Sequence, residues 1–167
     1  MSDYRVNNYP RASCRNIPMT FSNSSSVGRA APPLVSVIMP THDRPAELRI
    51  AIQSVLAQSH ENWELIVVND GGGDVSSVIS LANDSSRIHY IHLARSRGAA
   101  AARNVGLSLA QGEYVTYLDD DDWYDAQHLR VLVQQLEQSN ASVAYTDSRR
   151  VVEQRDQTRP GKPYVPC

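Results

Sequence analysis

The stretch LVSVIMPTHDRPAELRIAIQSVLAQ, residues 34–58, contains a buried strand followed directly by a helix. Residues 34–39 form a short apolar run that is rich in β-branched side chains and is closed by Pro40, a pattern typical of a strand buried on both faces. Pro45 suits the first turn of a helix, and apolar residues then recur at helical spacing as far as Gln58. A strand that leads directly into a helix predicts the βαβ units of a parallel sheet.

The same alternation of strand and helix continues along the chain. Further strands are predicted at residues 63–68, 87–93, 114–118 and 142–145, and further helices at residues 74–82, 98–110 and after Asp125. Asp74 and Asp125 are the predicted N-caps of their helices, and Tyr124 is placed to pack against Leu129. Short connections require right-handed crossovers, so we predict an α/β fold with a mostly parallel sheet and helices on both faces.

The chain of 167 residues is long enough for one domain. Residues 1–33 are rich in Ser, Asn, Arg and Pro without apolar periodicity, which predicts a flexible N-terminal extension. The predicted domain occupies residues 34–147. Residues 148–167 are predicted to be a C-terminal tail or the start of a further half.

Charge and cysteine content exclude several classes of function. The formal net charge of −2 leaves no basic excess for binding nucleic acid or an anionic membrane, whereas a single phosphorylated ligand is compatible with it. Cys14 and Cys167 lie near opposite ends of the chain, so they predict neither a disulfide framework nor a metal site. No signal peptide or membrane-spanning run is found, and we expect a cytoplasmic protein, at most peripheral to the inner membrane.

The polar segments of the domain follow its predicted strands. PTHDR (40–44), NDGGG (69–73), ARSRG (94–98) and DDDD (119–122) each stand where a strand ends. Ligands of open parallel sheets bind beyond the carboxyl ends of the strands. We therefore expect these four segments to meet at one crevice.

The four adjacent aspartates need a compensating charge. Neighbouring carboxylates repel each other by a few kcal/mol at the effective dielectric constant near a protein surface. A divalent cation such as Mg²⁺ or Mn²⁺ would offset this repulsion, and such cations are usually held by one or two carboxylates together with substrate phosphates. The alternative is a solvated acidic turn that caps the next helix, although Asp125 is already available as a cap.

Other phosphate-binding and acidic motifs do not fit. The chain has no GxxxxGK[ST] loop, and NDGGGDV lacks the GxGxxG spacing of a dinucleotide-binding fold. A receiver domain would place its acidic cluster early in the chain and an isolated aspartate later, which is the reverse of the order here. A sugar-1-phosphate nucleotidyltransferase would need a loop rich in glycine and lysine where this chain has PTHDRPAEL.

Three segments, in their order and spacing, carry a resemblance to a known family. They are VSVIMPTHDRPAELRIAIQSVLAQ (35–58), WELIVVNDGG (63–72) and GAAAARNVGLSLAQGEYVTYLDDDDW (98–123). Over residues 35–147 the chain resembles the inverting nucleotide-sugar glycosyltransferases of family 2, whose Rossmann-like fold is called GT-A. The usual wording of that family is PTYNR and DDGS where this chain has PTHDR and NDGG.

The resemblance implies a function in polysaccharide biosynthesis. The expected reaction transfers a sugar, with inversion, from a nucleotide-diphosphate donor, expected to be a UDP-sugar, to a hydroxyl of a carbohydrate or lipid-linked acceptor. The expected cofactor is Mn²⁺ or Mg²⁺. The alternative function is that of a non-catalytic nucleotide-sugar-binding module.

The resemblance also implies roles for individual positions. Pro40, Thr41 and Asp43 would border the nucleobase, and Asp70 would accept a hydrogen bond from uracil. Arg97 would contact the donor phosphates, while Arg103 and Asn104 would face the donor. Asp120 would reach the ribose or the sugar, and Asp119 and Asp121 would hold the metal. The uracil imide N–H needs an acceptor, and a carboxylate provides a charge-assisted bond. The alternatives are an Asx-turn at Asp70, a surface arginine at position 103 and a packing amide at position 104. His42, His89 and His92 lack metal-binding spacing and are predicted to be structural.

The general base is not identified in the sequence. In the family that the chain resembles, the base is a carboxylate well downstream of the DxD motif. Asp147, Glu153 and Asp156 are the carboxylates that follow the last predicted helix, and they stand too close to it to match. We therefore expect the base outside this chain, which would then be the nucleotide-binding half of a glycosyltransferase.

Overall fold

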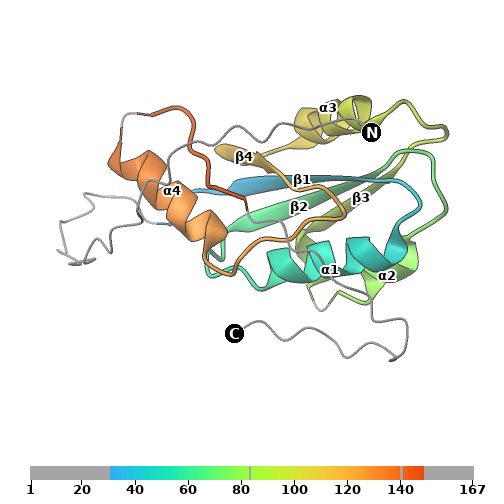
Figure 1. Cartoon of the computed structure of the whole chain (residues 1–167), viewed down its shortest axis with the longest axis horizontal. Helices are drawn as coiled ribbons and strands as arrows, with labels where there is room; N and C mark the ends of the chain where they lie inside the picture. The colour runs from blue at the N-terminus through green and yellow to red at the C-terminus, as the bar shows by residue number, and fades with distance from the viewer. Residues whose placement is uncertain (1–30, 83, 140, 149–167) are drawn as a thin grey trace, which may run out of the picture. The chain divides into compact units, whose positions relative to one another are not determined.

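The computed structural model describes residues 31–82, 84–139 and 141–148. Within these residues four strands form one sheet in the order β3-β2-β1-β4, and all three strand pairs are parallel (Figure 1). The strands are β1 (Val35–Thr41), β2 (Trp63–Asn69), β3 (Ile88–His92) and β4 (Tyr114–Tyr117). The predicted N-terminal extension and C-terminal tail lie almost wholly outside the described residues.

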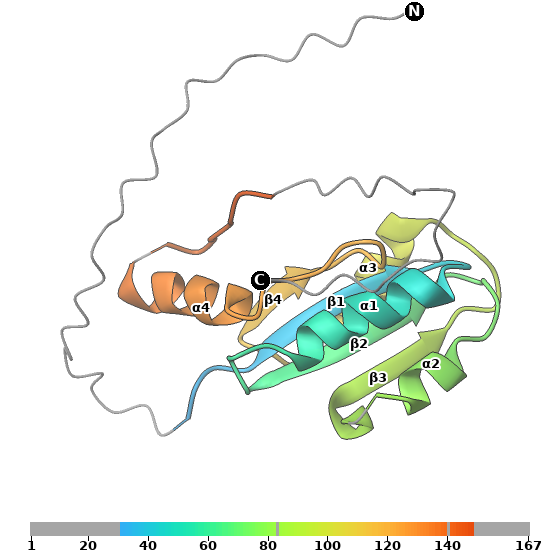
Figure 2. The ribbon, with the colours of Figure 1, turned by 60° about the horizontal axis from the view of Figure 1, so that its bottom comes forward.

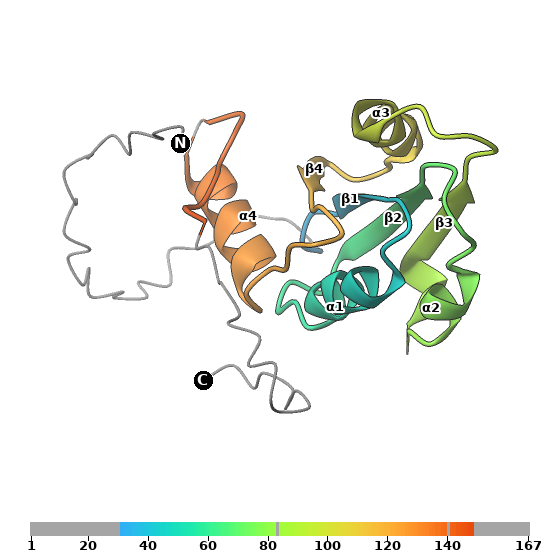
Figure 3. The ribbon, with the colours of Figure 1, turned by 45° about the vertical axis from the view of Figure 1, so that its right-hand side comes forward.

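Helices cover both faces of the sheet, as predicted. They are α1 (Pro45–Leu56), α2 (Ser76–Ser80), α3 (Ala99–Leu109) and α4 (His128–Gln138), with a short 3₁₀ turn, η1 (Ser85–Arg87). In the view of Figure 3, α3 lies above the sheet while α1 and α2 lie below it. Figure 2 shows α1 lying over β1 and β2. None of the helices in the described part of the chain is long and apolar enough to cross a bilayer.

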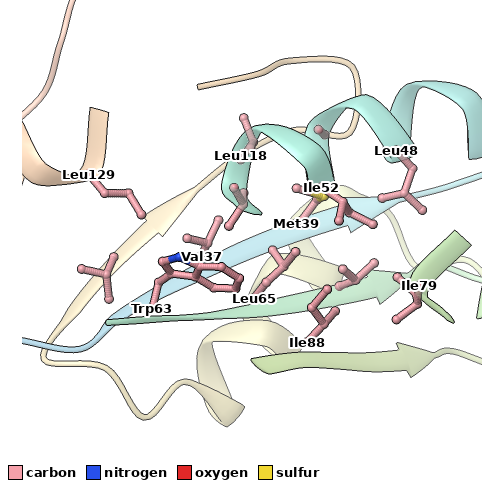
Figure 4. Packing of buried hydrophobic residues seen from close by; sticks show 14 of the residues in the cluster. Val37, Met39, Leu48, Ile52, Trp63, Leu65, Ile79, Ile88, Leu118 and Leu129 are labelled. Carbon is pink, nitrogen blue, oxygen red and sulfur yellow. The ribbon is translucent and has the colours of Figure 1, made fainter. Parts of the chain in front are cut away.

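The main core lies between the sheet and α1. Alternate residues of β1 and β2, including Val37, Met39 and Leu65, point toward Leu48 and Ile52 of α1 (Figure 4). Both strands are buried along their whole length, which explains their mostly apolar sequences. Residues of α2 and α4 join the same cluster, so one core holds three helices against this face.

On the opposite face, α3 approaches the sheet closely. Ala102 packs with Ile66 and Val68 of β2, and Gly106 lies over Ile38 of β1. A Cβ atom at Gly106 would stand only 2.5 Å from Cγ2 of Ile38. The small residues of this helix therefore permit the close packing that the sequence predicts.

Two local predictions are wrong. Residues 142–145 do not form a strand, and the side chains of Val143 and Tyr145 are 77% and 88% exposed. β-Branched and aromatic residues form a strand only where a partner strand and a core are available. Asp125 is not the N-cap of α4, which begins three residues later at His128. Gln58, at the end of α1, takes that role: its Oε1 accepts the N–H of Leu129 at 3.0 Å, and its Nε2 donates to the carbonyl of Asp125 at 2.8 Å.

The other predicted helix start is close to what the structure has. Asp74 stands one residue before the N-cap position of α2, and its carboxylate accepts the N–H of Ser76, the first helical residue, at 3.0 Å. Tyr124 packs against the core cluster to which Leu129 belongs, and its ring also stacks on His128 with 3.9 Å between ring centroids.

Candidate functional site

The loops that follow the strands meet at one edge of the sheet. Thr41, the last residue of β1, donates its hydroxyl to Asp120 Oδ2 at 2.8 Å, which joins two segments 79 residues apart in the sequence. The backbone N–H of Asp70 donates to the carbonyl of Thr41 at 2.9 Å. A hollow of about 300 Å³ lies between these loops and is lined by Pro40, Thr41, His42, Arg44, Asp70, Ala99, Arg103, Asp119, Asp120 and Asp121. Three of the four segments predicted to meet at a crevice therefore line this hollow, whereas residues 94–98 do not.

The negative charge of the acidic turn at residues 119–122 is partly compensated by two arginines. Arg103 of α3 donates to Asp119. Arg44 donates from Nη1 to Asp121 Oδ2 at 2.7 Å, and the same nitrogen stands 3.3 Å from Asp120 Oδ1. These contacts offset part of the carboxylate repulsion. Burial, and then the charges of Asp121 and Asp119, raise the pKa of the remaining carboxyl, Asp122.

Asp70 is a buried carboxylate that holds the loop before α3. Its Oδ1 accepts the backbone N–H of Arg97 at 2.8 Å, and its Oδ2 accepts the hydroxyl of Ser96 and the N–H of Gly98, each at 2.7 Å. The Ser96 hydroxyl and the two backbone donors lower the pKa of Asp70 despite its burial. Asp70 therefore fixes the position of the loop from which α3 begins.

The glycine loop after β2 is held by Asn69 and Asp43. The buried Asn69 accepts the N–H of Gly72 at 3.0 Å and donates to the carbonyl of Gly73 at 2.7 Å. Asp43, in a left-handed conformation at φ 54°, accepts the N–H of Gly73 at 2.7 Å. The Asx-turn considered for Asp70 is thus absent, because its neighbour Asn69 accepts the glycine N–H.

Gly71 is required where this loop meets the one before α3. Its φ is +75°, and a Cβ atom there would stand 2.3 Å from the backbone nitrogen of Ser96. Any side chain would separate the two loops that Asp70 joins. The glycine run in NDGGG therefore serves close backbone contact between neighbouring loops.

Most of the predicted site residues come together. Pro40, Thr41, Asp70, Arg103, Asp119, Asp120 and Asp121 all line the hollow of about 300 Å³. Three others lie outside this lining: Asp43 binds the glycine loop, Arg97 offers its backbone N–H to Asp70, and Asn104 is exposed on α3. Arg44 was not identified from the sequence as a residue of this site. The indication in the sequence was a cationic residue in the loop directly after the first strand.

A second, larger hollow adjoins the first at the acidic turn. It has a volume of about 1050 Å³ and shares Arg103, Asp119 and Asp121 with the first. Its lining is mostly polar but includes two exposed aromatic side chains, Trp123 and Tyr117, which are 48% and 47% exposed. The acidic turn thus lines both the polar hollow at the strand ends and the larger hollow, which is called the aromatic hollow below after Trp123 and Tyr117.

Tyr124 and Asp147 also line the larger hollow. The hydroxyl of Tyr124 is fixed by Thr116 and the carbonyl of Tyr117, each at 2.8 Å, and burial raises the pKa of Tyr124 to about 12. Glu153 and Asp156, the other carboxylates after α4, lie outside the described residues.

The acidic turn fits a cation that arrives together with a phosphorylated ligand. Among residues 31–82, 84–139 and 141–148, no three His, Cys, Asp or Glu side chains converge as a metal-binding group. Asp119 and Asp121 nevertheless offer two sets of hard carboxylate oxygens at the junction of the two hollows. Mg²⁺ and similar cations are commonly held by one or two carboxylates plus substrate phosphates, and the donors present match this requirement.

The sequence matches a known family over most of its length. The family described as glycosyl transferase family 2 matches residues 36–165. One relative, the UDP-Glc:alpha-D-GlcNAc-diphosphoundecaprenol beta-1,3-glucosyltransferase WfgD of Escherichia coli, is 36% identical over 112 residues, which cover 67% of this chain and 44% of WfgD. Across the curated relatives compared, this chain spans between 17% and 46% of their length.

Solved glycosyltransferase structures share the fold. Residues 1–349 of Staphylococcus aureus TarS in complex with UDP superpose with a TM-score of 0.62 at 22% identity, covering 71% of this chain and 38% of that one. The mannosyltransferase PcManGT of Pyrobaculum calidifontis, in complex with GDP-Man and Mn²⁺, gives a TM-score of 0.53 at 24% identity, covering 59% and 30%. These likenesses confirm the predicted GT-A type of α/β fold.

Proposed function

The chain belongs to glycosyl transferase family 2, and from this membership we propose that it transfers a sugar from a UDP-sugar to an acceptor hydroxyl with inversion. The observation that carries the proposal is the pair of hollows that share Arg103, Asp119 and Asp121. A transferase must hold two substrates on either side of the group that moves. The polar hollow would take the donor, and the aromatic hollow would take a carbohydrate or lipid-linked acceptor.

In the proposed donor site, the uridine lies against the loops after β1 and β2. Pro40, Thr41 and Asp43 border the base, and Asp70 accepts the uracil N–H. Asp70 Oδ1 accepts one hydrogen bond from Arg97, and a carboxylate oxygen has two lone pairs, so the oxygen retains an acceptor position. The name of WfgD includes UDP-Glc, and TarS has been solved with UDP, which supports a uridine donor.

The diphosphate of the donor would lie at the acidic turn. Asp119 and Asp121 would hold Mn²⁺ or Mg²⁺, which when bound would neutralise the charge that develops on the departing diphosphate. Arg97, Arg103 and Asn104 would face the phosphates from the start of α3, and Asp120 would reach the ribose or the sugar. The Mn²⁺ in the PcManGT complex supports a divalent cation in this fold.

The acceptor would rest on the aromatic side of the turn. The larger hollow combines aromatic side chains with many polar and charged ones, and a carbohydrate can use both, since polar groups fix its orientation while apolar surfaces contact its ring. Trp123 and Tyr117 offer flat apolar surfaces for the C–H faces of a sugar ring. Of the described carboxylates that follow α4, Asp147 lines this hollow and is the residue at which to test for a general base.

The alternative is a non-catalytic nucleotide-sugar-binding module. One observation favours it: the two carboxylates proposed to hold the cation already accept hydrogen bonds from arginines, Asp121 from Arg44 and Asp119 from Arg103. Release of UDP from UDP-glucose, measured with Mn²⁺ and with EDTA in the presence of a mixed glycan acceptor pool, separates the two functions. Mn²⁺-dependent, acceptor-stimulated release supports the transferase. Tight UDP-glucose binding without release supports either the module or a transferase whose general base lies outside this chain, as expected from the sequence, and Mn²⁺-dependent hydrolysis of UDP-glucose by water then favours the transferase.

The metal role has a direct binding test. Mn²⁺ is expected to tighten UDP binding strongly in the parent chain and much less in Asp121→Ala, as measured by calorimetry. Asp122→Ala is the matched variant, since it removes a neighbouring carboxylate of the same turn, and a smaller loss is expected there. Equal Mn²⁺ dependence in the parent chain and Asp121→Ala would remove Asp121 from the proposed metal site.

A further inference from the structure

Arg44 is the cation that this chain places on its own acidic turn. Its Nη1 donates to Asp121 Oδ2 at 2.7 Å and stands 3.3 Å from Asp120 Oδ1. On the premise of the metal-dependent function proposed above, we infer that Arg44 is a built-in counter-ion that competes with the divalent cation for Asp121. It would leave Asp121 when the cation and the nucleotide diphosphate bind together.

The competition follows from the atoms involved. Asp121 Oδ2 is bonded to a guanidinium, and a divalent cation at the same carboxylate would face that positive charge at close range. Asp120 is buried and is tied to Thr41 as well as to Arg44, so it cannot turn toward solvent to accept a second cation freely. Arg44 therefore opposes cation binding at Asp121 for as long as its guanidinium stays at Oδ2.

The position of Arg44 in the fold allows that movement. Arg44 stands immediately before α1, and its backbone carbonyl accepts the N–H of Leu48 at 2.9 Å, which anchors the main chain. Its side chain makes no capping bond to the helix and is 51% exposed. The guanidinium can therefore swing into solvent or toward a new anion without disturbing the helix.

A diphosphate would supply that new anion. Arg44 lines the same hollow as Thr41 and Asp70, on the side proposed for the donor. When the diphosphate enters with the cation, the guanidinium exchanges a carboxylate partner for a phosphate partner, and the positive charge stays compensated. Cation and nucleotide binding are thereby coupled, each favouring the other, as linkage between two ligands requires.

The test measures Mn²⁺ binding without any turnover. The concentration of free Mn²⁺ is followed by electron paramagnetic resonance during titration into the parent chain and Arg44→Gln, first without nucleotide and then with saturating UDP. Without UDP, Arg44→Gln is expected to bind Mn²⁺ about two- to fivefold more tightly, the range given by losing an exposed ion pair as competitor. With UDP the difference is expected to vanish or reverse, because the variant lacks the phosphate partner.

Arg49→Gln is the matched control, because it removes the same charge from the exposed surface of α1. It is expected to bind Mn²⁺ like the parent chain under both conditions. A thermal melt of each variant confirms that the samples compared are folded.

The outcomes distinguish this role from the proposed function. If the parent chain and Arg44→Gln bind Mn²⁺ equally without UDP, while UDP tightens Mn²⁺ binding in both, the counter-ion role is overturned and the metal-dependent function stands. Weaker Mn²⁺ binding by Arg44→Gln without UDP also overturns it, since Arg44 would then support the site. If saturating UDP does not tighten Mn²⁺ binding to the parent chain, the proposed metal dependence fails, and the inference about Arg44 fails with it.

Discussion

The carboxylate of Asp70 accepts the backbone N–H of Gly98 at 2.7 Å and so joins the end of β2 to the start of α3. Gly98 has φ +89° and stands directly before the first helical residue, so this bond helps to fix where α3 begins. Arg103, one turn further along α3, then reaches Asp119. Asp70 therefore shapes the donor side of the site even before any ligand contacts it.

Asp70→Asn is expected to weaken UDP binding by about 1.5–3 kcal/mol, the scale of a hydrogen bond to a charged group. The amide cannot accept the uracil N–H and also serve the three donors that the carboxylate accepts from residues 96–98. Calorimetric titration with UDP measures this loss.

Ser96→Ala is the control, because it removes one of these loop contacts and leaves the carboxylate in place. It is expected to lower the unfolding temperature slightly with a much smaller effect on UDP affinity. If both variants lost the same affinity, Asp70 would act on the loop alone and would not contact uracil.

Acid should weaken the fold partly through Asp70. Its pKa in the folded chain lies below the ordinary value, chiefly because of the Ser96 hydroxyl and the two backbone donors. A carboxyl group with a lowered folded-state pKa contributes stability above its unfolded pKa of about 3.9, and this contribution is lost as the pH falls through the lower folded value. Chemical unfolding between pH 7 and pH 2.5 is expected to show a shallower loss of stability in Asp70→Asn than in the parent chain below pH 4. Parallel curves for the two chains would contradict a linked titration at Asp70.

Gln58 gives a prediction about stability. Its side chain accepts the N–H of Leu129 and donates to the carbonyls of Ser54 and Asp125, so it joins α1 to the start of α4. Gln58→Ala would leave buried groups without partners, which is expected to cost about 1–3 kcal/mol in the free energy of unfolding. Urea denaturation measures the change.

Gln53→Ala is the matched control, since it makes the same substitution at an exposed position of α1. Helix propensity favours alanine by a few tenths of a kcal/mol at such a position, so this control is expected to be neutral or slightly stabilising. An equal loss in both variants would show that Gln58 acts as an ordinary helical residue.

The strands and helices that the sequence predicted correctly are those with a local signal. Residues 34–39 and 63–68 are mostly apolar, and the helix after Pro45 has a clear apolar stripe, so the pattern of apolar residues is enough to predict these elements. Residues 142–145 have a similar composition but are exposed in the structure. Composition shows what a segment can bury, whereas a strand also needs a neighbour to pair with.

The site was predictable to the extent that strand ends are predictable. Thr41, Asp70 and Asp120 meet because parallel strands bring their carboxyl ends to the same edge, which topology alone implies. The pairing of Arg44 with Asp121 and the capping of α4 by Gln58 join residues that are 77 and 71 positions apart. No local pattern specifies such pairs, because they depend on how loops of unequal length close over the sheet.

The aromatic hollow gives the last prediction, which concerns the acceptor. Trp123 stands directly after the acidic turn, is 48% exposed and lines the larger hollow, whereas it does not line the smaller one. Trp123→Ala is therefore expected to leave UDP and Mn²⁺ binding unchanged while it raises the KM for a glycan acceptor about 10-fold, from the loss of about 1–1.5 kcal/mol of aromatic contact. Trp123→Phe keeps a flat apolar ring and is expected to restore most of the acceptor affinity.

Steady-state transfer assays at saturating UDP-sugar, with the acceptor varied, separate KM from kcat and measure this effect. Asp147→Asn provides a contrasting variant in the same hollow: if Asp147 is the general base, kcat falls by about 10²–10⁴-fold with little change in acceptor KM. A loss of UDP affinity in Trp123→Ala would place Trp123 on the donor side of the turn. Unchanged acceptor kinetics in both variants would show that the acceptor does not bind in the larger hollow.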